Sequence, residues 1–174
     1  MTIFHCSIAS SLDGLIARPD GAVDWLVTGA GPPDEFGDKP FCASVDAIVM
    51  GRGTHEACRA MGGWPYADKR VIVRTTRPIA DAPDGVEGRN ATAAAIVAEC
   101  EAHGMARVWV EGGGDVIRQF LAIRRLDVLE VAVLPLVLGS GIRLFPDGCL
   151  ETRFALRSCT ARGGGVLHLI YDGA

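Results

Sequence analysis

The stretch Val108-Trp109-Val110-Glu111-Gly112-Gly113-Gly114-Asp115-Val116-Ile117 decides the fold of this chain. An apolar run stops at an acid, meets three glycines and resumes, which predicts a strand, a tight turn and the start of a helix. Glycine has no Cβ, so the N–H groups of the turn can approach an anion closely, and the helix dipole favours negative charge there. The turn is therefore a candidate phosphate site. Its alternative is a plain strand-to-helix connection.

A second stretch repeats this pattern earlier in the chain. Residues 45–50 predict a buried strand, and Gly51-Arg52-Gly53-Thr54 follows it, with Thr54 placed to cap a helix that continues through Cys58. The two glycines do not begin a Rossmann fingerprint, because the third glycine of that motif would fall at Glu56. The second turn strengthens the phosphate interpretation of the first.

Basic residues follow a third predicted strand, residues 71–73. The run Arg74-Thr75-Thr76-Arg77-Pro78 places two guanidinium groups and two hydroxyls directly beyond its carboxyl end. Because the planar fork of arginine can donate two hydrogen bonds to phosphate oxygens, this run is a candidate site for a phosphate monoester. Its alternative is a solvated surface loop.

The first predicted strand, residues 2–10, ends at Ser11-Leu12-Asp13-Gly14. Ligands of open α/β sheets bind at the carboxyl ends of the strands, so Asp13 is a candidate site residue, although Asp-Gly is also ordinary turn chemistry. Residues 18–33 form an irregular stretch long enough for a binding loop. A short helix capped by Asp34 is predicted to run to Ser44.

The rest of the pattern alternates between helix and strand and then becomes β-rich. Residues 81–89 are turn-rich, and the following elements are a helix at 92–104, a strand at 106–110, a helix at 115–122 and strands at 128–134, 154–160 and 166–171. The last two strands are joined around Gly163–Gly165 as a hairpin. This order predicts one α/β domain over residues 1–174, with a mostly parallel sheet flanked by helices and an antiparallel C-terminal hairpin.

Composition excludes several classes of protein. The chain has 174 residues, 49% hydrophobic and 22% charged, with a formal net charge of −4, unlike a disordered or nucleic-acid-coating protein. Its apolar runs fall far short of the roughly 20 residues of a membrane span, and no secretory leader pattern is present, so we expect a cytoplasmic protein without nucleic-acid or membrane partners. The six cysteines are scattered, and the four histidines have no visible triad partners; we expect no metal site.

Four motifs follow one another in a specific order, namely Ser11–Ala17, Asp46–Thr54, Val110–Gly114 and Pro135–Gly141. Together they resemble the reductase domain of bacterial riboflavin-biosynthesis deaminase-reductases and their stand-alone relatives in the dihydrofolate-reductase-like superfamily. The resemblance spans nearly the whole chain and implies a dihydrofolate-reductase-like fold that binds NADPH.

The resemblance also implies a role for each matched residue. NADPH is expected to contact three groups: Gly51, Arg52 and Thr54 at its ribose and phosphates; Gly112, Gly113 and Gly114 at its pyrophosphate; and Arg74, Thr75 and Arg77 at its 2′-phosphate. Asp13 and Glu111 match acids on the substrate side and are the candidate catalytic residues. Leu138, Gly139 and Ile142 are expected to contact the nicotinamide or the substrate.

The implied reaction is hydride transfer from NADPH to a C=N or similar polarised bond of a small heterocycle. A ribosylaminopyrimidine phosphate of riboflavin biosynthesis is a candidate substrate. We expect Glu111 rather than Asp13 to handle the proton, because Glu111 lies beside the phosphate turn, although either acid could anchor the substrate instead. The alternatives are a dihydrofolate-type reductase, whose acid would fall near Asp34 and Glu35, a flavoprotein reductase, and a nucleotide-binding or regulatory module without turnover.

The two signatures of a zinc deaminase, His-x-Glu and Pro-Cys-x-x-Cys, do not occur in the sequence, so only the reductase part of the resemblance applies. Residues 128–144 are almost continuously apolar, with Glu130 as the chief interruption. Such a segment is either buried in the domain's own sheet or left as an apolar surface, and the second case predicts a homodimer.

Overall fold

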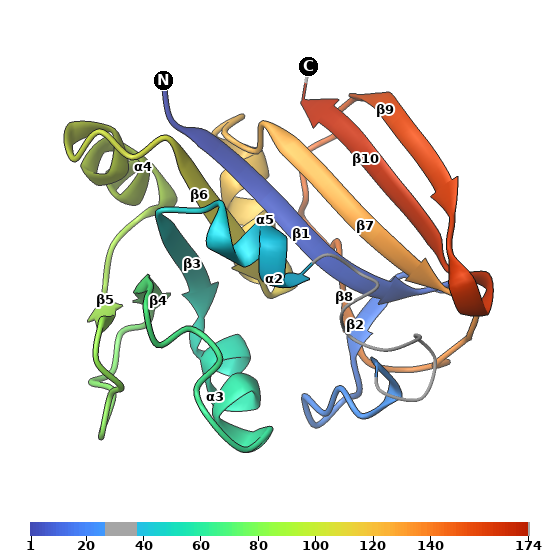
Figure 1. Ribbon diagram of the computed structural model, residues 1–174, viewed down its shortest axis with the longest axis horizontal. Coiled ribbons are helices and arrows are strands. Elements are labelled where there is room, and N and C mark those ends of the chain that lie inside the picture. The colour runs from blue at the N-terminus through green and yellow to red at the C-terminus, as the bar shows by residue number, and fades with distance from the viewer. Residues whose placement is uncertain (27–37, 174) are drawn as a thin grey trace.

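The computed structural model describes residues 1–26 and 38–173. Its main sheet has eight strands in the order β5-β4-β3-β6-β1-β7-β10-β9 (Figure 1). In chain order these strands are β1 (Ile3–Ser11), β3 (Ala47–Gly51), β4 (Arg70–Arg74), β5 (Val86–Arg89), β6 (Arg107–Gly112), β7 (Val128–Leu134), β9 (Phe154–Ala161) and β10 (Leu167–Gly173). A second, small sheet pairs β2 (Leu15–Ala17) with β8 (Ile142–Arg143).

Strand direction follows the predicted pattern. The strands from β5 to β7 pair in parallel, whereas β10 runs antiparallel to both β7 and β9. The turn between β9 and β10 is a short 3₁₀ segment at Gly163–Gly165, where Gly164 has a φ of 67°. The predicted mostly parallel sheet with an antiparallel C-terminal hairpin is therefore confirmed.

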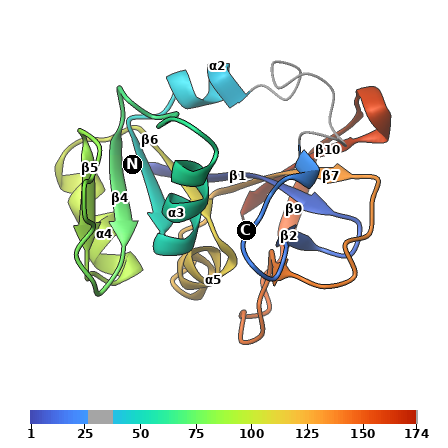
Figure 2. The same ribbon diagram turned by 90° about the horizontal axis from the view of Figure 1, so that it is seen from below.

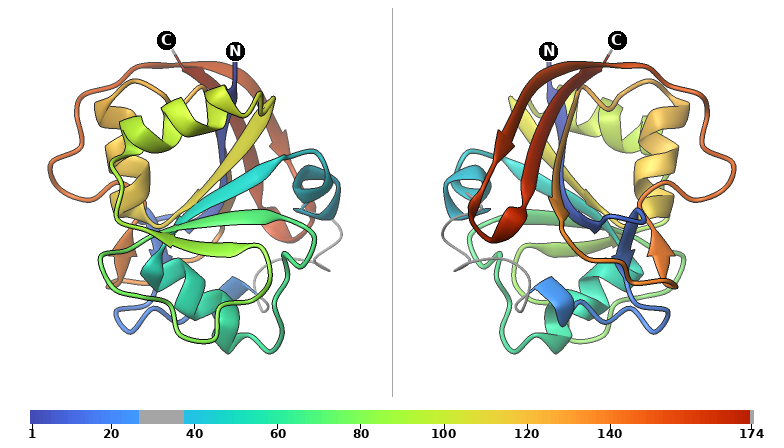
Figure 3. Two further views of the ribbon diagram at one scale, coloured as in Figure 1. Left: turned by 90° about the vertical axis from the view of Figure 1, so that its left-hand side faces the viewer. Right: turned by 90° about the vertical axis from the view of Figure 1, so that its right-hand side faces the viewer.

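Helices cover both faces of the sheet (Figures 2 and 3). The helices α4 (Ala93–Ala102) and α5 (Gly114–Ala122) pack on one face, and α2 (Asp38–Ala43) packs on the other. The helix α3 (Arg52–Ala60) begins directly after β3 and lies beyond the carboxyl end of that strand (Figure 1). Since β3 and β4 are covered on both sides, their central residues are apolar without strict alternation.

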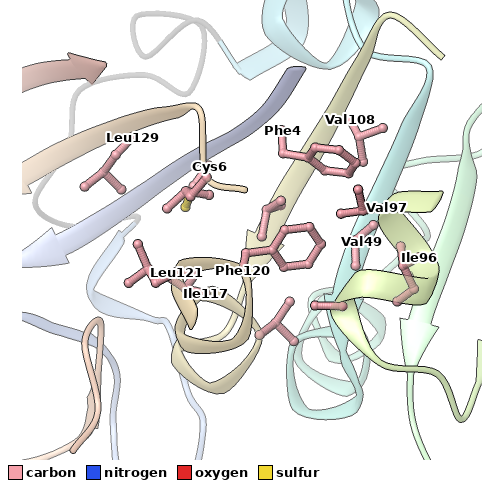
Figure 4. Packing of buried hydrophobic residues seen from close by; sticks show 14 of the residues in the cluster. Phe4, Cys6, Val49, Ile96, Val97, Val108, Ile117, Phe120, Leu121 and Leu129 are labelled. Atoms are coloured by element: carbon pink, nitrogen blue, oxygen red, sulfur yellow. The ribbon is translucent and has the colours of Figure 1, made fainter. Parts of the chain in front are cut away.

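The main core lies between the sheet and α4 and α5 (Figure 4). Phe4 of β1 stacks against Phe120 of α5 at 5.4 Å between ring centroids, and both side chains are fully buried. Truncating an aromatic side chain in such a position typically costs about 3–5 kcal/mol. This core fixes α5, and with it the glycine turn at its start.

Several local predictions differ from the structure. Residues 86–89 are a strand, not only a turn region, because β5 pairs along the edge of β4. Thr54 does not cap α3, since the helix begins at Arg52 after Gly51, and the short strands β2 and β8 have no strong sequence pattern. The predicted cap Asp34 and its neighbour Glu35 lie outside the described residues; among the described residues, the predicted range 34–44 contains α2.

Within residues 1–26 and 38–173, every helix lacks the length and apolarity that a bilayer crossing requires. The same residues contain no group of three or more histidine, cysteine, aspartate or glutamate side chains suited to a metal ion.

Candidate active site

The three predicted phosphate turns meet at one edge of the sheet. The parallel strands β3, β4 and β6 are neighbours (Figure 1), and their carboxyl ends lead into Gly51, Arg74 and Gly112. β1 ends at the same edge and leads into Asp13. The topology therefore brings together residues that are about 100 positions apart in sequence, as open α/β sheets do at their ligand sites.

The two glycine turns are in direct contact. A Cβ on Gly113 would meet the Thr54 hydroxyl at 3.7 Å and the Ile16 side chain at 3.4 Å, and a Cβ on Gly51 would lie 3.8 Å from the carbonyl oxygen of Gly112. The peptide bond between Gly112 and Gly113 is cis. The start of α3 and the start of α5 thus share one small space that contains Gly113 and the Thr54 hydroxyl.

Both helices begin without a side-chain cap among the described residues. The first N–H groups of an α-helix have no partner within the helix, and an anion at that point satisfies them and interacts well with the helix dipole. Two such helix ends side by side form a site suited to a diphosphate. This geometry supports the phosphate interpretation of the glycine turns.

Gly114 has a packing role in addition to its predicted contact with the cofactor. A Cβ at this position would collide with the carbonyl oxygen of Arg143 and would lie 3.1 Å from that of Leu144. The strand β8 therefore passes too close to α5 for any side chain here. Contact of Gly114 with the pyrophosphate stays a prediction.

Arg52 braces the loop after β4. Its guanidinium donates to the hydroxyl of Thr75 at 2.8 Å and to the carbonyl oxygens of Arg77 and Pro78 at 2.6 and 2.8 Å. The Thr75 hydroxyl also accepts from the backbone N–H of Arg77 at 3.1 Å. Arg52 and Thr75 thus set the shape of the arginine loop, and their direct contact with a cofactor stays a prediction.

The other two arginines of this edge differ in the hydrogen bonds that their guanidinium groups make. Arg74 donates from Nε to the carbonyl oxygen of Ala91 at 2.7 Å. Arg77 is exposed, and its guanidinium has no hydrogen-bond partner in the described part of the chain, although its backbone is held by Arg52 and Thr75. The structure therefore presents Arg77 as an available cation on a fixed backbone.

Asp13 connects two loops. Its carboxylate accepts from the Ser11 hydroxyl at 2.6 Å and from the backbone N–H groups of Leu138 and Gly139 at 3.1 and 2.8 Å. The Ser11 hydrogen bond, with those of Leu138 and Gly139, lowers the pKa of Asp13 to about 2. Asp13 is therefore ionised at neutral pH and holds residues 138–139 against the end of β1. Ile142 lies in β8, opposite Ala17 of β2, and is exposed.

Glu111 lies on the sheet face opposite to α5, in a different environment. Its Oε1 accepts a hydrogen bond from the hydroxyl of Tyr66 and one from the thiol of Cys58 at 3.6 Å. Burial, with the negative charge of Glu111, raises the pKa of the Tyr66 hydroxyl and raises that of the Cys58 thiol to about 12. Both donors therefore keep their protons at neutral pH.

Aromatic rings pack around Tyr66, whose hydroxyl binds this carboxylate. Tyr66 makes edge-on contacts with Trp64 and Trp109, at 5.3 and 5.7 Å between ring centroids, and Trp64 contacts the ring of His55 at 5.4 Å. His55 is 4% exposed, and neither of its ring nitrogens has a hydrogen-bond partner among the described residues. Burial, with the nearby charges of Arg59 and Arg52, lowers the pKa of His55, so the ring is neutral.

Sequence reasoning missed Tyr66, Trp64 and Cys58 as site residues. The contact between Tyr66 and Glu111 joins positions 45 residues apart, and no local pattern encodes it. The one available signal was the cluster Trp64-Pro65-Tyr66 in an otherwise turn-rich loop. Aromatic residues in a loop directly after a predicted phosphate-binding helix could have marked this segment as a wall of the site.

Two other features lie away from this edge. A pocket of about 500 Å³ lies on the α5 face, lined by Ser10, Leu129, Val131, Phe145, Leu169, Tyr171 and seven further residues. On the opposite face, Glu130 joins His5 and His168 at 2.8 and 2.6 Å. His5 and His168 are thus hydrogen-bond partners of Glu130 within the sheet, away from the phosphate turns.

The sheet order, the reversed β10 and the glycine turn before α5 define a dihydrofolate-reductase-like fold. Within that class, the chain belongs to the family of the RibD C-terminal domain, which matches residues 4–168. The family predicted from the four motifs is therefore confirmed.

Three similar proteins illustrate this membership. The Bacillus subtilis (strain 168) protein YwjB is 34% identical over 165 residues, which cover 94% of each chain. The riboflavin biosynthesis protein RibD of Corynebacterium ammoniagenes is 31% identical over 158 residues, 83% of this chain but 46% of RibD. The crystal structure of a putative riboflavin biosynthesis protein from Shewanella sp. PV-4 superposes with a TM-score of 0.90, with 26% identity and 99% coverage of both chains.

Proposed function

We propose that this protein is an NADPH-dependent reductase that transfers a hydride to a C=N or similar polarised bond of a small heterocyclic substrate. One observation carries the proposal: two uncapped helix starts meet at Gly113, beside an arginine loop, on the sheet edge that also bears Glu111. Membership in the RibD C-terminal domain family supports the same reaction class.

The residues at the edge fit the parts of NADPH. The turn at Gly113 is open enough for a diphosphate, because a Cβ there meets only Ile16 and Thr54 at ordinary contact distances. Arg77 and Arg74 supply cations for the 2′-phosphate; Arg52 holds the backbone of Arg77, and the carbonyl oxygen of Ala91 holds the guanidinium of Arg74. When bound, NADPH supplies the hydride for the reaction.

The two acids have different roles in this proposal. Glu111 faces the substrate from the wall formed by Tyr66, Trp64 and Trp109, because it lies at the end of β6 directly before the glycine turn. Asp13 shapes the opposite side by holding Leu138 and Gly139, and Ile142 continues that side. Positioning of substrate and cofactor by such groups is the main protein contribution to hydride transfer.

The candidate substrate is a ribosylaminopyrimidine phosphate, as in riboflavin biosynthesis. This chain matches 46% of the length of RibD from Corynebacterium ammoniagenes, a protein named for riboflavin biosynthesis. That similarity supports the choice of substrate. Planar heterocycles with N–H groups suit a site with a carboxylate and aromatic walls.

The test is NADPH oxidation, followed as loss of the reduced-nicotinamide absorbance, with 5-amino-6-(5-phosphoribosylamino)uracil and with dihydrofolate as separate substrates. We expect saturable oxidation with the aminouracil phosphate and a much lower rate with dihydrofolate. The reverse preference would contradict the proposed substrate class. Saturable NADPH binding without oxidation of any heterocycle tested would contradict a reductase and favour a nucleotide-binding module. A flavin that copurifies with the protein would contradict direct transfer from NADPH.

A further inference from the structure

The contact between Tyr66 and Glu111 is built from two separate segments. Tyr66 and its companion Cys58 belong to the connection between β3 and β4, whereas Glu111 ends β6. Both donors reach the same oxygen, Oε1, so the connection closes over the end of β6. A hydrogen bond from a neutral donor to a carboxylate is charge-assisted and therefore stronger than a neutral pair.

The ring of Tyr66 is held on two sides. Trp64 and Trp109 contact it edge-on, with interplanar angles of 89° and 84°. Trp109 is itself fixed, because its Nε1 donates to the carbonyl oxygen of Ser7 at 3.0 Å and its ring contacts Phe41 at 5.3 Å. The Tyr66 hydroxyl therefore has a defined position, and the carboxylate that it binds is oriented with it.

The protonation of the donors determines what Glu111 can do. The pKa of Tyr66 is raised by burial and by the charge of Glu111, so the phenol remains a donor at working pH. Such a donor stabilises the ionised form of its acceptor. An ionised, oriented carboxylate accepts hydrogen bonds from N–H groups, which aminopyrimidines present at their edges.

We propose that Tyr66 is a positioning residue of the reductase, whose hydroxyl orients the Glu111 carboxylate and keeps it an acceptor for the N–H groups of an aminopyrimidine substrate. This inference rests on the proposed function and deepens it. Glu111 then anchors the substrate, and solvent water supplies the proton that follows the hydride. Tyr66 acts only through Glu111.

The first test compares Tyr66→Phe with Tyr171→Phe, which removes the hydroxyl of the chain's other tyrosine, on the α5 face. The Tyr66→Phe variant keeps the ring and its contacts with both tryptophans, so this change isolates the hydroxyl. With NADPH and 5-amino-6-(5-phosphoribosylamino)uracil, we expect kcat/KM to fall about tenfold in Tyr66→Phe, mainly through KM, because one charge-assisted hydrogen bond is lost. The NADPH affinity of Tyr66→Phe and the kcat/KM of Tyr171→Phe should both equal those of the unaltered protein.

The pH profile gives a readout that a purely structural role would not move. Without the phenol, the ionised form of Glu111 is less stabilised, so the acid limb of the kcat/KM profile should move to higher pH by about one unit. In the double variant of Tyr66→Phe with Glu111→Gln, the tyrosine change should add almost nothing, since its partner is already altered. An unmoved acid limb, or an undiminished Tyr66 effect beside Glu111→Gln, would overturn the inference.

A spectrum without substrate separates this inference from the proposed function. At neutral pH, the near-ultraviolet absorbance band of Tyr66 should shift in Glu111→Gln relative to the unaltered protein, because the Tyr66 hydroxyl loses its charged acceptor. If this shift occurs but NADPH neither binds nor is oxidised, the proposed function fails and the positioning role fails with it, while the contact stands. If NADPH is oxidised and the shift is absent, the inference alone fails.

Discussion

At the scale of single residues, the arginines of the sheet edge have two different roles. Some hold the loop backbone through hydrogen bonds, and others are free to bind an anion. Arg52 is occupied by three contacts to the loop at 75–78, whereas Arg77 projects from that loop without a partner among the described residues. The residue types alone suggest the same role for both. The structure separates them because a guanidinium that fills its donor positions with carbonyl oxygens has few left for a phosphate.

The 2′-phosphate assignment is tested by Arg77→Ala. We expect NADPH to bind about tenfold more weakly, because a charge-assisted contact of this kind contributes on the order of 1–3 kcal/mol, while NADH, which has no 2′-phosphate, changes little. Nucleotide fluorescence titrations measure both affinities. Arg162→Ala, which removes an exposed arginine from the β9–β10 turn, is the matched control. Equal losses of affinity for NADPH and NADH would show that Arg77 does not bind the 2′-phosphate.

A second residue-scale prediction concerns Glu130. Burial alone would raise the pKa of this carboxyl, but the hydrogen bonds with His5 and His168 outweigh it and lower the pKa. A lowered carboxyl pKa stabilises the folded state above the ordinary value of about 4.3, and this stabilisation is lost as the pH falls through the folded-state value. We therefore expect Glu130→Gln to reduce the free energy of unfolding by about 1–2 kcal/mol at neutral pH and by much less near pH 3.

Urea unfolding at the two pH values measures this difference. Asp24→Asn serves as the comparison, because the Arg18–Asp24 pair is largely exposed, with side chains 42% and 62% accessible, and exposed pairs contribute little. A Glu130→Gln effect that is the same at both pH values would show that the ionised carboxylate is not the stabilising form.

At the scale of elements, the glycine turn before α5 contains two glycines with different roles. Gly113→Ala places a methyl group in the small space near Thr54, so we expect a folded protein that binds NADPH at least tenfold more weakly. Gly114→Ala drives its Cβ into the backbone of β8, so we expect a loss of about 1–3 kcal/mol in stability. Thermal unfolding and NADPH titration separate the two effects. A normal NADPH affinity in a folded Gly113→Ala protein would show that the turn only connects β6 to α5.

Elements with strong local patterns could be predicted from the sequence. The apolar runs of β3, β4, β6 and β7 and the alanine-rich helix α4, which Thr92 caps through the N–H of Ala95 at 3.2 Å, needed no tertiary information. β5, β2 and β8 could not be found in this way, since they are short and depend on pairing with a neighbour. The same limit applies to the site: the glycine and arginine turns are local, whereas the Tyr66–Glu111 contact exists only in the folded chain.

At the scale of the whole molecule, the predicted apolar segment, residues 128–144, is paired within the sheet in its first part and bears two exposed apolar side chains, Val137 and Ile142, in its second. The strand β7 has both edges paired, with β1 and β10, so residues 128–134 are not an open edge. Four further exposed apolar side chains, Phe145, Leu150, Leu156 and Leu167, lie around the pocket on the α5 face or share its side of β9 and β10. Surfaces of this kind usually mark an interface.

The homodimer therefore stays a prediction, now with a defined face. We expect light scattering to give twice the chain mass of 18.4 kDa, and Leu156→Glu to shift the protein toward the monomer, because a charge would be buried at the contact. Met61→Glu alters an exposed apolar residue elsewhere and should leave the mass unchanged. A monomer mass for the unaltered protein at high concentration would reject the dimer.

Binding of NADPH at the carboxyl edge of the sheet can be located by a backbone amide NMR titration of the protein with NADPH. We expect saturable shifts concentrated in residues 51–54, 74–77 and 111–116, where the two helix starts and the arginine loop meet. Shifts confined to the pocket lined by Leu129, Val131 and Leu169, or no saturable shift at all, would contradict it.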